Sequence, residues 1–307
     1  MPLGGFRGGC YKDHRPSTFR VNDVALLPLV VFALLQGAVV LLPLSAPAHG
    51  TLASLLTSWP TPGPAFDIAV SLGTLAAVLV YCRDDVRAIA SGAWRKMRRR
   101  RSVGGRVEAA LRLAGCLVLG AMPLSLAIVA APALGWSPGP LTLPVLGWSS
   151  VGIALALWAA DSLNMTVKRV EHLSWTDALV IGAVVALAVF PGAGRGALAI
   201  GAARFLGCER RAALRFSALI SIPLLGLVGS VAMARLIADG APVAPAPFLL
   251  AGAVAFAGGW AALEILTRWL RRHTYAPFVL YQVGVGAAAL GVAYGLPFAR
   301  DALTRLV

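Results

Sequence analysis

The chain has 307 residues, of which 58% are hydrophobic and 13% are charged, and its mean hydropathy is +0.79. Soluble domains carry about 25% charged residues, so this composition excludes an ordinary soluble domain, a disordered chain and a disulfide-rich scaffold. It indicates a polytopic membrane protein. The net charge of +14 does not require nucleic acid as a partner, because most basic residues gather between apolar segments, where they set membrane orientation.

Stretches without Asp, Glu, Lys or Arg recur at the length of a membrane-crossing helix, about 20 residues. These stretches cover 24–66, 113–160, 216–234, 240–263 and 274–299. The first two are long enough for two segments each, and both are interrupted by a turn rich in Pro, Gly and Trp. Backbone groups inside a bilayer find no water, so the segments must be helices. We predict six full spans, at roughly 65–81, 108–130, 147–165, 216–237, 247–268 and 276–296.

The basic residues predict the orientation of these spans. Nine Lys and Arg residues fall between 83 and 106, and others gather at 168–169, 204–215 and 268–272. The positive-inside rule places these basic loops in the cytoplasm and the Pro/Gly-rich turns outside. Near the cytoplasmic helix ends, Glu264 and Asp161 are expected to pair with Arg268 and Lys168.

Two segments do not fit a simple succession of spans. Residues 178–203 are apolar except for Arg195, yet basic residues flank them on both sides. The break at 191–196 predicts two half-helices, 178–190 and 196–207, that form a re-entrant hairpin. The first apolar run has the same construction, with a helix at 24–42, a break at 43–50 and a short helix at 51–58. Broken helices at membrane depth require a backbone that is buried or lines a cavity.

A short internal repeat connects the two predicted hairpins. Gly37-Ala38-Val39-Val40 recurs as Gly182-Ala183-Val184-Val185, each time a few residues before a proline. We predict an all-α membrane domain at 24–300, built from inverted repeats at roughly 24–130 and 147–296 and preceded by a basic arm at 1–23. Inverted repeats place a binding site where two broken helices meet near the midplane of the membrane.

Two ionisable residues lie inside the predicted breaks, where such groups indicate function. Arg195 is the only charge between Asp177 and Arg204. Its guanidinium and the adjoining helix N-terminus suit a phosphate. His49 is the only titratable side chain between Asp23 and Asp67, and a histidine serves as a nucleophile or a general base. We predict that the two residues share one cavity.

Three segments around these residues form recognisable motifs. They read Gln36-Gly37-Ala38-Val39-Val40-Leu41-Leu42-Pro43-Leu44-Ser45-Ala46-Pro47-Ala48-His49, then Pro191-Gly192-Ala193-Gly194-Arg195-Gly196, then Arg215-Phe216-Ser217-Ala218-Leu219-Ile220-Ser221-Ile222-Pro223. The chain resembles the undecaprenyl-diphosphate phosphatases of the bacitracin-resistance type, whose motifs are E-G-x-x-E-F-L-P-x-S-S-T-G-H, P-G-x-S-R-S and R-F-S-x-L-L-S-I-P. Tyr281-Gln282 stands where that family usually has Tyr-Arg. The resemblance spans about 24–296.

The chain departs from the family at several motif positions. Gln36 and Val40 replace both glutamates, and Gly194 and Gly196 replace the serines beside the arginine. We expect these glycines to widen the site while they keep its charge. The resemblance implies that His49, Arg195 and Ser45 are catalytic. It also implies a set of substrate-binding residues: Gln36, Gly192, Gly194, Gly196 and Ser221. No metal site or other cofactor site is readable, because Mg²⁺ and Ca²⁺ prefer carboxylate oxygens and neither hairpin motif holds one.

Two functions follow as alternatives. In the first, the protein hydrolyses undecaprenyl diphosphate to undecaprenyl phosphate and phosphate, and so recycles the lipid carrier of peptidoglycan synthesis and contributes to bacitracin resistance. In the second, it binds or translocates a polyprenyl phosphate lipid without hydrolysis. Both place it as a multi-pass protein of the bacterial inner membrane. Its expected partners are a polyprenyl diphosphate or phosphate lipid and the membrane, with a homodimer as a further candidate and no nucleic acid.

Overall fold

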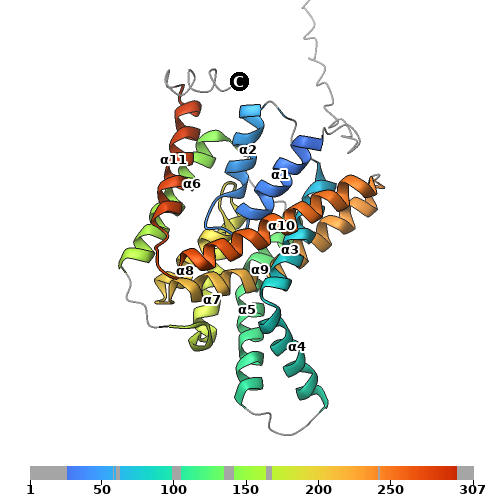
Figure 1. Cartoon of the computed structure of the whole chain (residues 1–307), viewed down its shortest axis with the longest axis vertical. Coiled ribbons are helices and arrows are strands. Elements are labelled where there is room, and N and C mark those ends of the chain that lie inside the picture. The colour runs from blue at the N-terminus through green and yellow to red at the C-terminus, as the bar shows by residue number, and fades with distance from the viewer. Residues whose placement is uncertain are drawn as a thin grey trace, which may run out of the picture.

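The computed structural model describes residues 26–57, 59, 63–98, 105–134, 142–163, 168–240 and 243–295, which form an all-helical fold (Figure 1). The long helices are α3 (Pro64–Tyr81), α4 (Arg83–Arg98), α5 (Gly105–Ala133), α6 (Leu143–Leu163), α9 (Arg210–Ala238), α10 (Pro245–Trp269) and α11 (Ala276–Ala293). Shorter helices are α1 (Leu26–Val39), α2 (Ala46–Thr57), α7 (Trp175–Ala186), α8 (Arg195–Phe205) and the 3₁₀ turns η2 (Val170–His172) and η3 (Leu187–Val189). The predicted fold class is confirmed, whereas the arm at 1–23 lies outside the described residues.

Six described helices are long and apolar enough to cross a membrane: α3, α5, α6, α9, α10 and α11. They coincide with the six predicted spans. The largest shift is in α9, which begins at Arg210 instead of near residue 216. The first turn of α9 is basic, and charged residues continue a helix readily at the head-group level, where water satisfies them.

Each predicted hairpin is a helix, a turn and a second helix. In the second hairpin, α7 and η3 lead to the turn before α8, and these elements lie close to the predicted half-helices 178–190 and 196–207. In the first, α2 begins at Ala46 rather than at the predicted residue 51. Pro47 is the second residue of α2, where proline costs nothing because its missing N–H has no helical partner there. His49 therefore lies in the first turn of a helix and not in an irregular break.

One segment that the sequence predicted to be a basic loop forms a regular helix. Residues 83–98 form α4, which extends with the first half of α5 beyond the other helices (Figure 1). Asp84 and Asp85 lie in its first turn, and Arg95, Lys96 and Arg98 lie in its last turn. This distribution complements the helix dipole at both ends.

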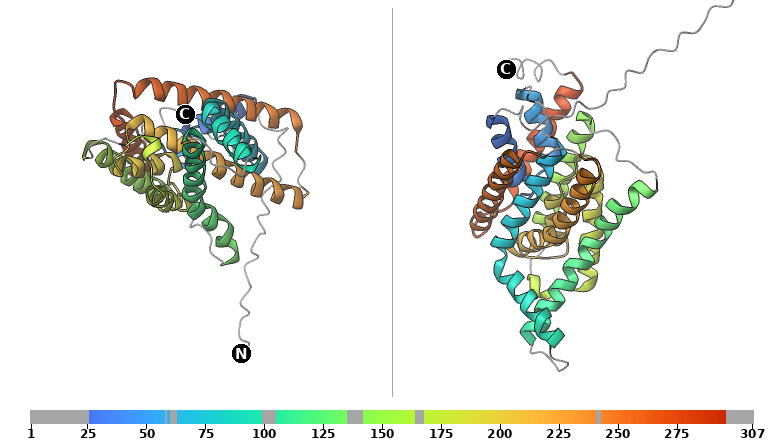
Figure 2. Two further views of the ribbon diagram at one scale, coloured as in Figure 1. Left: turned by 90° about the horizontal axis from the view of Figure 1, so that it is seen from below. Right: turned by 90° about the vertical axis from the view of Figure 1, so that its right-hand side faces the viewer.

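The repeated glycines occupy comparable positions in the two hairpins. A Cβ atom on Gly37 of α1 would lie 2.5 Å from the carbonyl oxygen of Ala255 in α10, and one on Gly182 of α7 would lie 2.3 Å from that of Gly120 in α5. Each hairpin therefore packs its first helix tightly against a spanning helix distant in sequence. Figure 2 gives two further views of the helices. This correspondence suits the inverted repeat, which stays a prediction.

Ion pairs concentrate at the basic side of the molecule. Asp161 pairs with Arg204 Nε at 2.9 Å and with Arg210 Nε at 2.8 Å, so it joins α6, α8 and α9. The predicted pairing with Lys168 is wrong, because Lys168 Nζ lies 3.1 Å from Asp177. The physical reason is the burial of Arg204, whose side chain is only 1% exposed. A buried guanidinium needs a paired carboxylate, and Asp161 provides it. The predicted Glu264–Arg268 pair is confirmed at 2.8 Å.

Candidate active site

The turns of the two hairpins meet inside the protein. A Cβ atom on Gly194 would lie 2.3 Å from the carbonyl oxygen of Leu44, and one on Gly196 would lie 2.7 Å from that of Leu42. Side chains cannot enter gaps of this size. The expectation that these glycines widen the site is therefore wrong, since their missing side chains let the two backbones touch.

Ser45 links the two turns by a hydrogen bond. Its hydroxyl donates a hydrogen bond of 2.6 Å to the carbonyl oxygen of Gly192, and Gly192 has a positive φ of 86°, a backbone conformation that glycine adopts without strain. Ser45 also precedes α2, where its Oγ accepts from the N–H of Ala48 at 3.4 Å as an N-cap. From α11, the side-chain oxygen of Gln282 accepts from the N–H of Ser45 at 3.3 Å. The serine is only 2% exposed.

His49 is held on both ring nitrogens. Nδ1 lies 2.6 Å from the carbonyl oxygen of Ser45, and Nε2 lies 3.0 Å from the hydroxyl of Tyr281. A carbonyl only accepts, so Nδ1 carries the proton, and in the neutral ring Nε2 offers its lone pair to the tyrosine hydroxyl. The two rings also stack, with centroids 5.4 Å apart. Nε2 is thus the reactive nitrogen. The Ser45 hydroxyl is donated elsewhere, so the structure does not form a serine–histidine pair.

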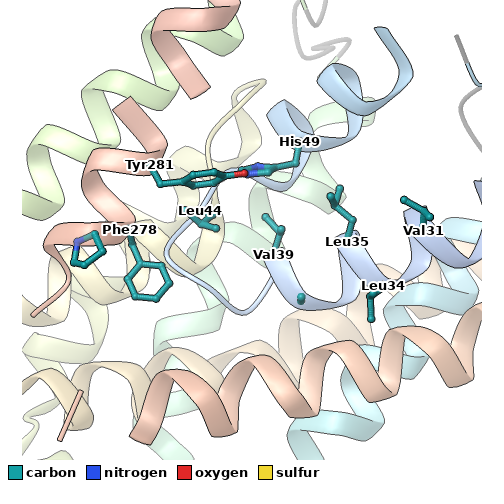
Figure 3. Close-up of a pocket in the computed structure, with 10 residues that line it drawn as sticks. Val31, Leu34, Leu35, Val39, Leu44, His49, Phe278 and Tyr281 are labelled. Carbon is teal, nitrogen blue, oxygen red and sulfur yellow. The ribbon is translucent and has the colours of Figure 1, made fainter. Parts of the chain in front are cut away.

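A cavity of about 540 Å³ opens beside His49. Figure 3 shows the stacked His49 and Tyr281 at its edge, with Val31, Leu34 and Leu35 of α1 spread along it. The other lining residues are Ala38, Val39, Leu44, Pro277 and Phe278. The walls are therefore apolar apart from the two ring side chains, and they suit a hydrocarbon chain.

Arg195 begins α8, between the two glycines that contact the first hairpin. Its Nη1 atom is buried and has no hydrogen-bond partner among the residues that the structure describes. An unpaired buried guanidinium nitrogen is costly, and an anion would satisfy it. Arg195 does not line the cavity beside His49. The motifs that carry the two residues are therefore in contact, whereas the predicted shared cavity contains His49 alone.

The remaining predicted site residues lie at different distances from this contact. A Cβ atom on Gly50, the neighbour of His49, would lie 3.9 Å from Nε2 of Gln36, so Gln36 stands beside the first turn of α2. Ser221 is buried in α9, and its hydroxyl donates to the carbonyl of Ser217 at 2.8 Å within the same helix. Gln36 therefore lies at the site, whereas the hydroxyl of Ser221 is used by a hydrogen bond within its own helix.

Three residues of the site had no assigned role in the sequence: Tyr281, Gln282 and Ser149. A Cβ atom on Gly192 would lie 2.2 Å from the hydroxyl oxygen of Ser149 in α6, so this serine touches the second turn directly. Tyr281-Gln282 was noticed only as a motif match. Its separation from Ser45 and His49 by more than 230 residues leaves no local signal of contact.

The side chains around His49 do not fit a resident divalent cation. Those within reach are neutral oxygen and nitrogen groups of Ser45, Tyr281, Gln282 and Gln36, whereas Mg²⁺ and Ca²⁺ sites use carboxylates. Within the described ranges, no three His, Cys, Asp or Glu side chains gather as metal ligands.

Comparison with known proteins agrees with the geometry. The family model described as bacitracin resistance protein BacA matches residues 29–288. Undecaprenyl-diphosphatase 1 of Rhodospirillum rubrum is 40% identical over 278 residues, which cover 88% of this chain and 95% of that protein. The undecaprenyl-diphosphatases of Maricaulis maris and Hahella chejuensis are each 34% identical and cover 87% and 86% of this chain, with 98% and 97% of their own lengths.

Proposed function

This chain belongs to the bacitracin resistance protein BacA family, and we propose that it is an undecaprenyl-diphosphate phosphatase. It hydrolyses undecaprenyl diphosphate to undecaprenyl phosphate and phosphate, and so returns the lipid carrier to cell-wall synthesis. One observation carries the proposal at the level of chemistry. His49, whose basic Nε2 lies 3.0 Å from the Tyr281 hydroxyl, stands at the edge of an apolar cavity, next to a turn that holds Arg195, whose buried Nη1 has no hydrogen-bond partner among the described residues.

The substrate fits this arrangement in two parts. Its polyprenyl chain is apolar and takes the cavity between α1 and α11, which is lined by aliphatic and aromatic side chains. Its diphosphate takes the region of the meeting turns. There Nη1 of Arg195 lacks a partner within the described part of the chain, and the N-terminus of α8 adds backbone N–H groups and a favourable dipole.

The chemistry requires one reactive nitrogen and charge stabilisation. Nε2 of His49 either attacks the terminal phosphorus or takes the proton from the attacking water, and Arg195 neutralises charge on the transferred phosphoryl oxygens. The bond that breaks joins the terminal phosphorus to the bridging oxygen, and water completes the release of phosphate. We assign Ser45 to holding the two turns in register, since its hydroxyl bonds Gly192. Gln36, Gly192, Gly194 and Gly196 shape the phosphate region around it.

Phosphate release from undecaprenyl diphosphate by the purified protein tests this function. We expect His49→Ala and Arg195→Ala to lower the rate by about 10²–10⁴-fold, the usual effect of losing an acid–base or charge-stabilising group. The exposed His273 and Arg272 provide matched controls, and their alanine variants should retain the wild-type rate. Wild-type protein that binds the lipid but releases no phosphate would instead support the non-hydrolytic binder. Acid-labile phosphate trapped on His49 would identify the histidine as the nucleophile.

The six membrane-length apolar helices among the described residues make the chain a multi-pass membrane protein. We place it in the bacterial inner membrane, where its lipid substrate resides, with the basic helix ends in the cytoplasm according to the positive-inside rule. A homodimer stays a prediction.

A further inference from the structure

A second cavity, of about 710 Å³, lies at the basic side, away from His49. Its walls come from the end of α3, the start of α9, the end of α10 and the turn η2. Tyr81, the last residue of α3, hydrogen-bonds Thr267 of α10 at its edge. Because α3 and α10 are apolar spans that end here, the cavity lies at the level of the lipid head groups on the predicted cytoplasmic side.

The carboxylates that line this cavity are all engaged by arginines. Arg215 donates two hydrogen bonds to Asp85, from Nε at 2.9 Å and from Nη2, and one of 2.9 Å to Glu171. Arg169 lies 3.6 Å from Glu209. Glu264 is held at 2.8 Å by Arg268, which comes from outside the lining. Three arginines therefore balance three of these four carboxylate charges, and Arg211 and Arg271 give the whole group a net charge of +1.

Two arginines that line the cavity, Arg211 and Arg271, have no carboxylate partner among the described residues. Arg211 lies in the first turn of α9 and Arg271 just beyond the end of α10, and both are exposed. Neither has an ion pair or a side-chain hydrogen bond in the part of the chain that the structure describes. Arg211 comes from α9 and Arg271 from the turn after α10, and both line the same polar cavity. A phosphate, with its forked oxygens, is the anion that two such groups bind best.

We propose that this cavity binds a phosphate group between Arg211 and Arg271, carried by an anionic phospholipid head group or present as free phosphate. Basic pockets between the cytoplasmic ends of spanning helices have the charge and depth that an acidic lipid head group requires. The site is separate from the one that holds His49, so its occupancy does not depend on hydrolysis.

Affinity measurements on the purified full chain test this site. Thermal unfolding, followed by tryptophan fluorescence, is titrated with phosphatidylglycerol in mixed micelles, with inorganic phosphate, and with phosphatidylcholine as the neutral lipid. We expect Arg211→Gln/Arg271→Gln to weaken binding of one anionic probe by about tenfold or more, the effect of losing charge-assisted bonds. The double variant Arg95→Gln/Arg272→Gln removes two exposed charges outside the cavity, and it should bind as the wild type does.

The probes separate the two sources of the phosphate group. A loss confined to phosphatidylglycerol identifies a lipid site, and a loss confined to inorganic phosphate identifies a soluble ligand. Arg271→Glu, at an exposed position that leaves packing intact, should weaken binding further than Arg271→Gln, whereas Arg272→Glu should not. Equal affinity of the cavity variants and their controls for both anionic probes overturns the proposal. Phosphate release from undecaprenyl diphosphate, measured in parallel, should be unchanged in all of them.

Discussion

At the scale of the residue, the proposed chemistry depends on how His49 is oriented. The backbone carbonyl of Ser45 fixes the proton on Nδ1 and so directs the lone pair of Nε2 toward Tyr281 and the apolar cavity. No carboxylate is needed for this orientation. A main-chain oxygen four residues earlier provides it, because Ser45 caps α2 and His49 lies in the first turn of that helix.

Tyr281 completes this arrangement, and we expect its hydroxyl to bind a phosphate oxygen once substrate displaces it from Nε2. We expect Tyr281→Phe to keep the ring stack but to lower kcat/KM for undecaprenyl diphosphate about tenfold, the effect of losing one hydrogen bond of about 1.4 kcal/mol. The exposed Tyr294, which bonds Trp148 at 3.3 Å, gives a control in Tyr294→Phe. A wild-type rate in Tyr281→Phe would remove the tyrosine from the mechanism.

Substitution of Ser45 distinguishes a structural role for this serine from a nucleophilic one. Ser45→Ala leaves the carbonyl of Gly192 unpaired and removes the N-cap of α2. We expect the free energy of unfolding to fall by about 2 kcal/mol, while phosphate release falls by less than about tenfold. Thermal unfolding and the phosphate assay on the same sample measure both. Complete loss of activity in a folded Ser45→Ala protein would make the serine the nucleophile.

His49 and Arg195 were predictable as residues of interest because each is the only strongly polar group in a long apolar stretch. Their neighbours were not. Tyr281 and Gln282 lie on a helix whose composition resembles any other span, and their contacts with His49 and Ser45 depend on how α11 packs against the first hairpin. Polar contacts between distant helices follow from tertiary packing, which a single sequence does not display.

At the scale of the element, the hairpins fit together because α8 has no side chain at its contact points. Gly196 and Gly201 lie in the same helix but in different surroundings. A Cβ atom at 196 meets the carbonyl of Leu42 at 2.7 Å, whereas one at 201 meets only Leu157 at 4.0 Å. The two positions therefore give opposite predictions for the same substitution.

We expect Gly196→Ala to lower the free energy of unfolding by about 1–3 kcal/mol through overpacking and to slow phosphate release, because the turns separate. Gly201→Ala should instead raise stability by about 0.5–1 kcal/mol, since alanine favours a helix. Thermal unfolding of the two variants in one detergent provides the measurement. If Gly196→Ala were as stable as Gly201→Ala, the hairpins would not be in contact there.

The elements themselves were largely predictable, since long apolar runs and proline breaks specify spans and hairpins. The errors arose where local chemistry decides. Proline within the first turn was read as a break, although it is tolerated there, and so α2 was started too late. The charged stretch at 83–98 was read as loop, although its acidic start and basic end favour a helix.

At the scale of the whole molecule, the basic side and the site lie at different depths. The ion pairs of Asp161, Asp177 and Arg215 bind the ends of α6, α7, α8 and α9 together at the basic side. The two hairpin turns meet within the protein, away from that side. This separation lets the charged residues set the orientation of the protein without entering the reaction.

The inverted, re-entrant arrangement makes a prediction about sidedness. If the second hairpin is re-entrant, both its ends face the cytoplasm, and both ends of the first face the opposite side. Single cysteines at Thr176 and Glu209 for the second hairpin, and at Leu26 and Thr57 for the first, report this with a membrane-impermeant maleimide. They require a background without native thiols, although burial raises the pKa of Cys208 to about 11 and makes it a poor nucleophile.

We expect the positions 176 and 209 to react in inside-out vesicles together with a reference cysteine at Arg87 on α4, and the positions 26 and 57 to react in right-side-out membranes. The reason is physical: α7 with η3 and α8 are joined by a turn that packs against the first hairpin, so the chain reverses before it has crossed the bilayer. Reaction of 176 and 209 from opposite sides would show that the second hairpin spans the membrane. The spans after it would then reverse their direction, and the basic ends of α9 and α10 would lie on the side that the positive-inside rule disfavours.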